Sequence, residues 1–483
     1  MLQLYSRLTC LMTLICLSSA CIPLESEPHE DTQRRIHSGQ IRGSLYRHNT
    51  HVWRGIPYAD APVGVRRWRA PKPPAPWPGT RDMLEFGSMC PQVGGRLVTD
   101  DSSLFGTIIG DEDCLSLNVY APAFSVNTIP RGSERLPVMV WIHGGANRFG
   151  SGDFFDPSVL VDTQELIVLT LNYRLGVFGT FRHPSLSALN DNPADISGNF
   201  ALLDIIEALS WVQRNIAAFG GDPNRVTVFG ESSGAYLISG LLVTPLAQDL
   251  FHAAIIQSGT METGDIQAAE SPADSDETKP VHSSIELVNH LLIQQKKVAN
   301  REAAMALQNR AARSHVRQWL LDASPKDLII ASHRYRPKYR TMPLLFPDGH
   351  VIPEAGIRPH LMRYGAAVPI MIGHNRDEMR FFNMFNPNMV DRFGYMPYSV
   401  KDWPLYEAHS DYGSLFWQLS GVDEPVTAIM AGKKSLGRAD LPAFSHSLSH
   451  SSPLPSSRLF RQLLCSSILR LDVIDCDNRS VVV

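Results

Sequence analysis

The chain has 483 residues, of which 44% are hydrophobic and 19% are charged, and its formal net charge is -4. This length and composition allow one large α/β domain with a substantial core. The acidic balance and the lack of a polybasic run argue against nucleic acid as the main partner and against a basic membrane-binding surface.

The N-terminus has the pattern of a secretory signal peptide over residues 1–20. Arg7 precedes an apolar stretch at residues 8–17, and small residues follow it. The apolar stretch is too short to span a bilayer, and no later segment offers a membrane span. We therefore expect a secreted, periplasmic or extracellular protein with a flexible leader over residues 21–36. Cys21 is a candidate for lipid modification, although the residues before it fit a lipoprotein site poorly.

The first half of the chain alternates between strand-like and helical patterns. Residues 37–130 hold short strand-like pieces and a proline-rich stretch at 71–78, which predict loops and an irregular edge of a sheet. Near-continuous apolar runs at 137–142 and 166–171 predict buried parallel strands. Apolar residues at helical spacing predict an amphipathic helix from about 199 to 218.

The alternation continues towards the C-terminus. Further strands are predicted at residues 226–229, 253–256 and 369–373, and residues 262–340 predict a mostly helical insertion that covers the site. Strands that alternate with helices indicate an α/β fold with a mostly parallel, doubly wound central sheet. We find no internal repeat.

The pentapeptide Gly230-Glu231-Ser232-Ser233-Gly234 lies between a predicted strand and an apolar helical stretch. A serine on such a sharp turn exposes its hydroxyl to a histidine on one side and to a substrate carbonyl on the other. The glycines are required because a Cβ there would collide with neighbouring backbone. The pentapeptide alone is common by chance, and its strand–helix context makes it informative.

Two further segments follow predicted strands. His143-Gly144-Gly145-Ala146 offers bare backbone N–H groups that can point at a substrate oxygen, although the same sequence is equally typical of a tight turn. Residues 375–378 contain an acidic pair at the carboxyl end of a strand, where ligand chemistry sits in open α/β sheets.

These residues and several collinear motifs from about residue 41 to 382 resemble the type-B carboxylesterases. This α/β-hydrolase family includes the cholinesterases and the non-catalytic neuroligins. The remaining motifs lie at residues 54–59, 112–120, 172–179, 197–200, 219–223, 346–349 and 373–378. The resemblance implies an α/β-hydrolase domain over residues 37–431 that hydrolyses carboxylic esters through an acyl-enzyme.

The resemblance assigns a role to each part of the site. Ser232 is expected to be the nucleophile, and the backbone N–H groups of Gly145, Ala146 and Ser233 are expected to form the oxyanion hole. Ala146 replaces the third glycine of the common pattern and Ser233 replaces an alanine, but neither change removes a backbone donor.

The resemblance also assigns the acid and a disulfide. Glu378 is expected to be the acid member of the triad, with Asp377 as the competing carboxylate. Cys90 and Cys114 bracket a loop rich in glycine and aspartate, and they match the first disulfide of the family. The other two cysteines beyond Cys21, Cys465 and Cys476, lie near the C-terminus.

Three departures from the family are visible. The loop between Cys90 and Cys114 has no tryptophan, which cholinesterases use to bind a quaternary ammonium group, so choline esters are not favoured. Residues 257–300 contain no cysteine, so the second disulfide of the family is missing. The third departure is that the histidine expected to act as the catalytic base is not identifiable.

After Glu378 only His409, His446 and His450 remain, and none has the sequence context of the family histidine. From residue 432 to 483 nothing resembles the family, so this segment is expected to lie outside the domain as a disordered or frame-shifted tail. Either the reading frame was lost near residue 432, or the tail is genuine and the protein is a pseudo-hydrolase. The first explanation is favoured because the other catalytic parts are intact.

The sequence supports two alternative hypotheses about function. The first is a serine esterase that acts on small neutral carboxylic esters, with turnover limited by the unidentified histidine. The second is a non-catalytic binding or adhesion module on the same fold. The sequence implies no metal and no organic cofactor, and it contains no H-E-x-x-H pair. Acyl preference, alcohol preference and oligomeric state are not readable from it.

Overall fold

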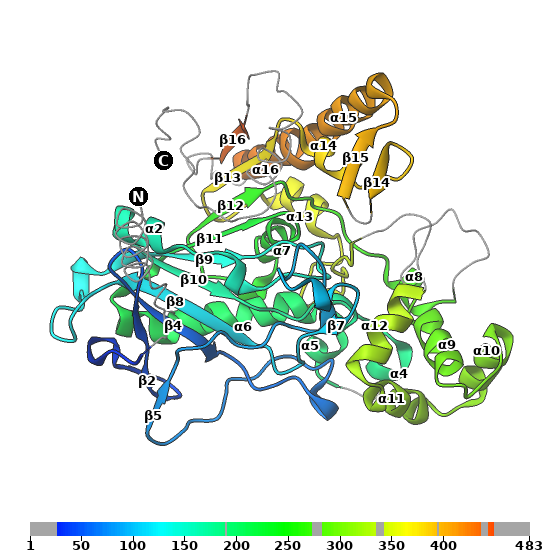
Figure 1. Ribbon diagram of the computed structural model, residues 1–483, viewed down its shortest axis with the longest axis horizontal. Helices are drawn as coiled ribbons and strands as arrows, with labels where there is room; N and C mark the ends of the chain where they lie inside the picture. The colour runs from blue at the N-terminus through cyan, green and yellow to red at the C-terminus, as the bar shows by residue number, and fades with distance from the viewer. Residues whose placement is uncertain are drawn as a thin grey trace, which may run out of the picture.

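The computed structural model describes residues 27–188, 191–272, 283–334, 342–393, 396–435 and 443–448. Its centre is a nine-stranded sheet whose strands follow in space the order β16, β13, β12, β11, β9, β10, β8, β4 and β3 (Figure 1). In this order the strands are Ala443–Leu448, Ile370–Asn375, Ala253–Gln257, Gly221–Glu231, Leu136–Ile142, Ile167–Leu171, Ser116–Pro122, Thr50–Pro57 and Ser44–Tyr46.

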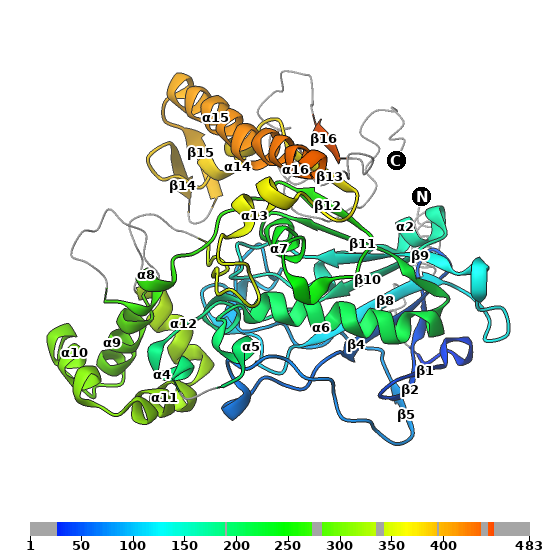
Figure 2. The ribbon, with the colours of Figure 1, turned by 180° about the vertical axis from the view of Figure 1, so that it is seen from behind.

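Neighbouring strands from β16 to β10 are parallel, whereas β8 runs antiparallel to β10, β4 to β8 and β3 to β4. The predicted mostly parallel sheet is therefore confirmed. The parallel strands are apolar because helices cover both faces of the sheet. Figure 2 shows α6 (Phe200–Asn215) lying across one face, with α7 (Ser233–Leu241) beside it.

The helix predicted over residues 199–218 is confirmed as α6 followed by the 3-10 helix η6 (Ile216–Phe219). Gly220 ends this pair in a left-handed conformation, with a φ of 91°. Nine consecutive residues of α7 are buried, so this helix is enclosed by the sheet and its neighbours.

The N-terminal part is more regular than its sequence suggests. The buried strands β4 and β8 take up positions inside the sheet, although residues 37–130 predicted an irregular edge. The short strands and helices around them are β1 (Arg34–Ile36), β2 (Gly39–Arg42), β5 (Thr80–Asp82), β6 (Gln92–Val93), β7 (Ile108–Ile109), η1 (Glu30–Thr32), η2 (Gly64–Arg66), η3 (Ser102–Leu104), η4 (Gly132–Glu134), η5 (Gly152–Phe154), α2 (Ser158–Gln164), α3 (Gly176–Gly179), α4 (Pro184–Ser187) and α5 (Pro193–Ile196).

The described parts of the insertion predicted over residues 262–340 are mostly helical, as expected. Its helices gather in a lobe at one end of the molecule, next to α4 (Figures 1 and 2). They are α8 (Ile266–Glu270), α9 (Ser284–Gln294), α10 (Arg301–Arg310), α11 (Arg313–Asp322) and α12 (Pro325–Arg334), and the 3-10 helix η7 (Pro245–Ala247) precedes them.

A second helical group follows the insertion. It comprises α13 (Ile357–Tyr364), α14 (Glu378–Asn383), β14 (Val390–Phe393), β15 (Met396–Val400), α15 (Trp403–Gln418), the π-helical turn η8 (Leu419–Asp423) and α16 (Glu424–Ser435). Within the described residues, no helix is long and apolar enough to cross a membrane.

The segment from residue 432 differs from expectation in its described part. Residues 443–448 form β16, which adds to the sheet parallel to β13 with His446 opposite Gly373. Strand pairing at the open edge of β13 satisfies backbone groups that would otherwise stay unpaired. The domain boundary at residue 431 remains a prediction, and residues 449–483 lie outside the described residues.

Candidate active site

Ser232 stands between β11 and α7 in a conformation that L-residues rarely adopt, with φ 54° and ψ -120°. Its backbone N–H donates to the carbonyl oxygen of Gln257 at the end of β12, over 2.8 Å. Its side chain is only half-buried. Strained backbone of this kind costs about 1–3 kcal/mol and clusters at functional sites.

The glycines of the pentapeptide are required for close packing, as predicted. A Cβ on Gly230 would lie 2.7 Å from the Ile142 carbonyl oxygen, and a Cβ on Gly234 would collide with the same atom. Both contacts are to the backbone at the end of β9, which cannot move without disturbing the sheet. The turn therefore presses directly against the start of the loop after β9.

That loop contains His143 to Ala146 and lies beside the serine. A Cβ on Gly144 would come 3.2 Å from the Ser232 Cβ. The His143 ring stacks on Tyr173 with centroids 4.3 Å apart, and the Tyr173 hydroxyl donates to the His143 carbonyl oxygen over 2.7 Å. Burial lowers the pKa of His143 to about 4, so its ring is neutral and holds the loop in place.

Backbone donors are available in this loop. Gly145 has a φ of 109° and Ala146 a φ of 56°. Among the described residues, no hydrogen-bond acceptor meets the N–H groups of Gly145, Ala146 or Ser233. Ala146 adopts the left-handed conformation that the glycine in the common pattern takes without strain. Alanine in place of glycine at this position keeps the backbone N–H group but adds backbone strain.

The two carboxylates after β13 have different environments. Glu378 is 7% exposed, and one of its oxygens accepts a hydrogen bond from Asn375 Nδ2 over 2.9 Å. Its other oxygen, Oε1, is buried without a partner among the described residues. Asp377 instead lies at the surface in ion pairs with Arg376 and Arg380. An unpaired buried acceptor suits the acid of a triad, because that oxygen must hold a histidine N–H.

Glu231 is a third carboxylate near the site, and its place in the pentapeptide predicted no further role for it. Its Oε2 lies 2.8 Å from the position of a Cβ on Gly144. Burial, together with the negative charge of Glu378, raises the pKa of Glu231 to about 8. The two carboxyl groups are therefore close enough to interact, which links the elbow to the loop that carries the candidate acid.

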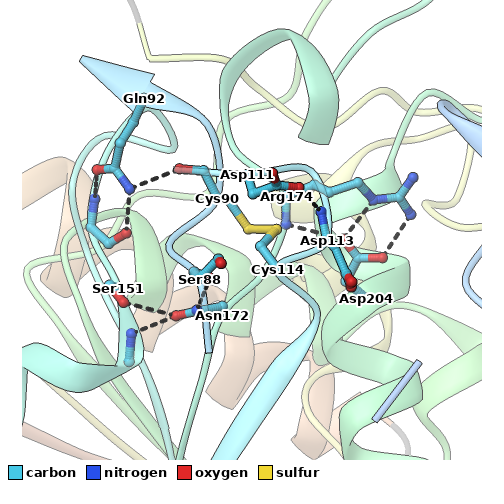
Figure 3. The surroundings of a disulfide bond; sticks show 12 residues. Ser88, Cys90, Gln92, Asp111, Asp113, Cys114, Ser151, Asn172, Arg174 and Asp204 are labelled. Atoms are coloured by element: carbon cyan, nitrogen blue, oxygen red, sulfur yellow. Dashed lines mark hydrogen bonds and ion pairs between the residues drawn. A yellow bond between two sulfur atoms is a disulfide. The ribbon is translucent and has the colours of Figure 1, made fainter. Parts of the chain in front are cut away.

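The Cys90–Cys114 disulfide is present in the structure, with Cα atoms 5.0 Å apart. Gln92 fastens its loop to the backbone of Gly150 through two hydrogen bonds of 2.8 and 3.0 Å. Asn172 donates to the carbonyl oxygen of Ser88 over 3.0 Å, so the loop is tied to the end of β10 as well (Figure 3). The covalent bond therefore anchors the loop beside the segment that follows the candidate oxyanion donors.

A cavity of about 520 Å³ opens beside the same loop. Its walls come from the loop after β9, from the insertion helices and from the segment before α13. They include Ala146, Phe149, Leu287, Ile329, His333 and Phe346. The cavity is mainly apolar, and it touches one of the three candidate oxyanion donors. His333 was not singled out in the sequence because no motif surrounds it.

The histidines after Glu378 are distributed unevenly. His409 is exposed on α15, and His446 lies within β16, opposite Gly373 of β13. His450 lies outside the described residues. Because β16 and β13 are parallel, both strands end at the same edge of the sheet. Glu378 follows β13 by three residues, and His450 follows β16 by two residues.

The chain is similar to known carboxylesterases in both sequence and fold. The sequence profile of the carboxylesterase family matches residues 30–394. Mouse acylcarnitine hydrolase is 42% identical over 244 residues, and the match covers 49% of this chain and 41% of that protein. Para-nitrobenzyl esterase of Bacillus subtilis is 46% identical over 227 residues, covering 47% and 43% of the two chains. The matched region is therefore less than half of each curated relative.

Solved structures match more of the chain. A PNB esterase has 29% sequence identity and a TM-score of 0.60, and the match covers 88% of this chain and 82% of that one. The carboxylesterase EST55 of Geobacillus stearothermophilus has 27% identity and a TM-score of 0.60, with coverage of 88% and 81%. The fold is the α/β-hydrolase fold, as the resemblance implied. Since the family profile spans most of its length, the chain belongs to the carboxylesterase family.

Proposed function

We propose that this chain is a serine esterase that hydrolyses small neutral carboxylic esters through an acyl-enzyme. The observation that carries this proposal is the strained turn at Ser232, which is packed against a loop whose backbone N–H groups at Gly145 and Ala146 meet no acceptor among the described residues. Export is proposed as well, because residues 1–20 have the pattern of a signal peptide and a disulfide closes the loop at Cys90.

In the proposed reaction, the Ser232 Oγ attacks the ester carbonyl while a histidine accepts its proton. The N–H groups of Gly145, Ala146 and Ser233 hold the negative oxygen of the tetrahedral intermediate. The histidine then protonates the leaving alcohol, and the acyl group remains on Ser232. Water attacks the acyl-enzyme by the same steps and regenerates the hydroxyl. Glu378 accepts the second N–H of the histidine throughout.

The base is proposed to be His450. This choice is supported by its place in the sequence, two residues after the end of β16, because β16 and β13 are parallel and end at the same edge of the sheet. His409 is less suitable because α15 exposes it to solvent. His446 is within a strand and stands opposite Gly373, before the strand end is reached. If His450 is the base, the missing histidine no longer argues for a lost reading frame.

The cavity beside Ala146 is proposed to hold an apolar acyl or alcohol group of the ester. Its walls are mainly hydrophobic, including Phe149, Leu287 and Phe346, and apolar surface favours uncharged substrates. The binding-module alternative is not favoured, because the nucleophile, the acid and the donor loop are all retained.

Labelling by a fluorophosphonate together with hydrolysis of a p-nitrophenyl ester tests this proposal on the full chain. Ser232→Ala should abolish labelling. His450→Ala should lower kcat by roughly a thousandfold or more, as loss of a triad base does. His409→Ala, the matched control, should leave kcat unchanged. Absence of labelling in the folded, unmodified chain would contradict the esterase assignment. Full activity of His450→Ala would refute His450 as the base but would leave the esterase assignment standing.

A further inference from the structure

Arg67 is a buried cation that joins two segments far apart in the chain. It follows η2 and is 6% exposed. Its Nε and Nη2 donate to the two carboxylate oxygens of Glu112 over 2.6 and 2.5 Å, which is the bidentate geometry of a strong ion pair. Its Nη1 donates to the carbonyl oxygens of Leu320, Leu321 and Ala323 over 3.0, 3.1 and 2.8 Å. These contacts are here called the Arg67 link.

The three carbonyl oxygens belong to the end of helix α11. This helix ends at Asp322, and α12 begins at Pro325. The last carbonyl groups of a helix have no N–H partner within it and carry partial negative charge, so a guanidinium group satisfies and stabilises them. Because only two residues separate the two helices, holding the end of α11 also holds the start of α12.

Glu112 belongs to the loop that the Cys90–Cys114 disulfide closes. It is 9% exposed and lies two residues before Cys114. The side chains of Arg67 and Glu112 line one small crevice together with Pro91 and Cys114, so the ion pair lies at the base of this loop, beside the disulfide. The Arg67 link therefore connects the disulfide loop to the helical insertion.

The Arg67 link lies directly behind the walls of the cavity beside Ala146. Pro91 and Phe178 line both this cavity and the crevice around Arg67. Arg67 itself is not among the described residues that line the cavity, so it holds two walls without meeting their contents. The disulfide loop and α12 supply the following residues to those walls: Gln92, Val93, Ile329, Ser332 and His333.

Other contacts keep the insertion attached without fixing α11. Arg182 forms an ion pair of 2.8 Å with Glu270 of α8, the first helix of the insertion. Helix α12 contacts α3 and α9. Loss of the Arg67 link should therefore loosen the end of α11 and the start of α12 while the insertion stays on the domain.

We propose that Arg67 is a positioning residue that determines the size of the apolar ester group that the cavity accepts. This inference rests on the proposed esterase function and extends it to substrate selection. The Arg67 link holds the disulfide loop and α12 in one arrangement, so the cavity is shaped before the ester enters. A preorganised cavity binds a matching group more tightly than a mobile one, because its walls lose less freedom on binding.

A double variant, Arg67→Met with Glu112→Leu, tests this role. Removal of Arg67 alone would leave the buried Glu112 carboxylate unpaired. Replacement of both members of a buried ion pair by apolar side chains of similar size usually leaves a protein folded. Arg66→Met is the matched control, because Arg66 is the adjacent residue and its ion pair with Asp60 lies at the surface.

Hydrogen exchange measured by mass spectrometry tests the link without any catalysis. Amides of residues 325–334 in α12 should exchange about tenfold faster in the double variant, whereas those of β9 should be unchanged. Arg66→Met should match the unmodified chain throughout. The proposal is overturned if α12 exchanges at the same rate in the double variant and the unmodified chain. It is also overturned if β9 accelerates as much as α12, because the ion pair would then stabilise the whole fold.

Two series of esters test substrate selection. The first varies the acyl group of p-nitrophenyl esters from acetate to octanoate, and the second varies the alcohol of acetate esters from ethyl to octyl. The double variant should raise KM for the longest ester of one series and lower its kcat/KM relative to the shortest by roughly fivefold. The kcat for p-nitrophenyl acetate and the rate of Ser232 labelling by a small fluorophosphonate should stay within about twofold.

The outcomes separate this inference from the esterase proposal. Unchanged relative kcat/KM in both series, with labelling intact, would overturn the role in selection and leave the esterase function standing. Absence of labelling in the unmodified chain would instead contradict the esterase function. The exchange rates of α12 would then still decide whether Arg67 holds the two walls together.

Discussion

Replacement of Glu231 by glutamine tests how much ionisation of this buried carboxyl group lowers the free energy of unfolding. Glu231 has an ordinary pKa of 4.5, and burial beside Glu378 raises the pKa to about 8. The folded chain therefore keeps the Glu231 proton to higher pH than the unfolded chain does. Stability is unaffected well below pH 4.5, falls as pH rises from about 4.5 to about 8, and is constant above that range.

The magnitude follows from the size of the shift. Each pKa unit corresponds to about 1.4 kcal/mol, so the full cost has an upper limit of about 5 kcal/mol. The loss develops between about pH 4.5 and about pH 8, and partial exposure of the side chain makes it smaller. Glu231→Gln cannot ionise, so we expect it to gain about 2–4 kcal/mol relative to the unmodified protein over this interval.

Urea denaturation at pH 5, 7 and 9 measures this effect. The difference in unfolding free energy between Glu231→Gln and the unmodified chain should increase steadily with pH. Glu134→Gln, at an exposed position, should show no such trend. A difference that is the same at all three pH values would refute the reasoning, since it would show that glutamine changes packing rather than ionisation.

Two further substitutions test the site and the core. Gly145→Ala should reduce esterase activity at least tenfold, because the residue has a φ of 109° and its new Cβ would run into the Phe149 carbonyl oxygen. Gly95→Ala, in open space, should leave activity unchanged. Asp204→Asn should lower the unfolding free energy in urea by about 3–5 kcal/mol, because it leaves the buried Arg174 guanidinium without its charged partner. A loss below about 1 kcal/mol would mean that water replaces the carboxylate.

The strands and helices of the core were predictable because burial dictates their composition. Strands β9, β10, β12 and β13 are short apolar runs that admit few other interpretations. The buried strands β4 and β8 were harder to recognise, since they lie among prolines and loops. Their place in the sheet depends on antiparallel partners far away in the chain, which local composition does not encode.

The sequence by itself determined the family, the serine on its turn and the parallel sheet, because each depends on residue types at short spacing. Only the tertiary structure decided which carboxylate after β13 is buried. Asp377 and Glu378 are adjacent in sequence, yet Asp377 pairs with two arginines at the surface, whereas Glu378 is buried and one of its oxygens has no partner among the described residues. Only the tertiary structure also showed that β16 lies beside β13 and that Glu231 lies close to Glu378. These contacts join segments far apart in the chain, and no local sequence pattern predicts them.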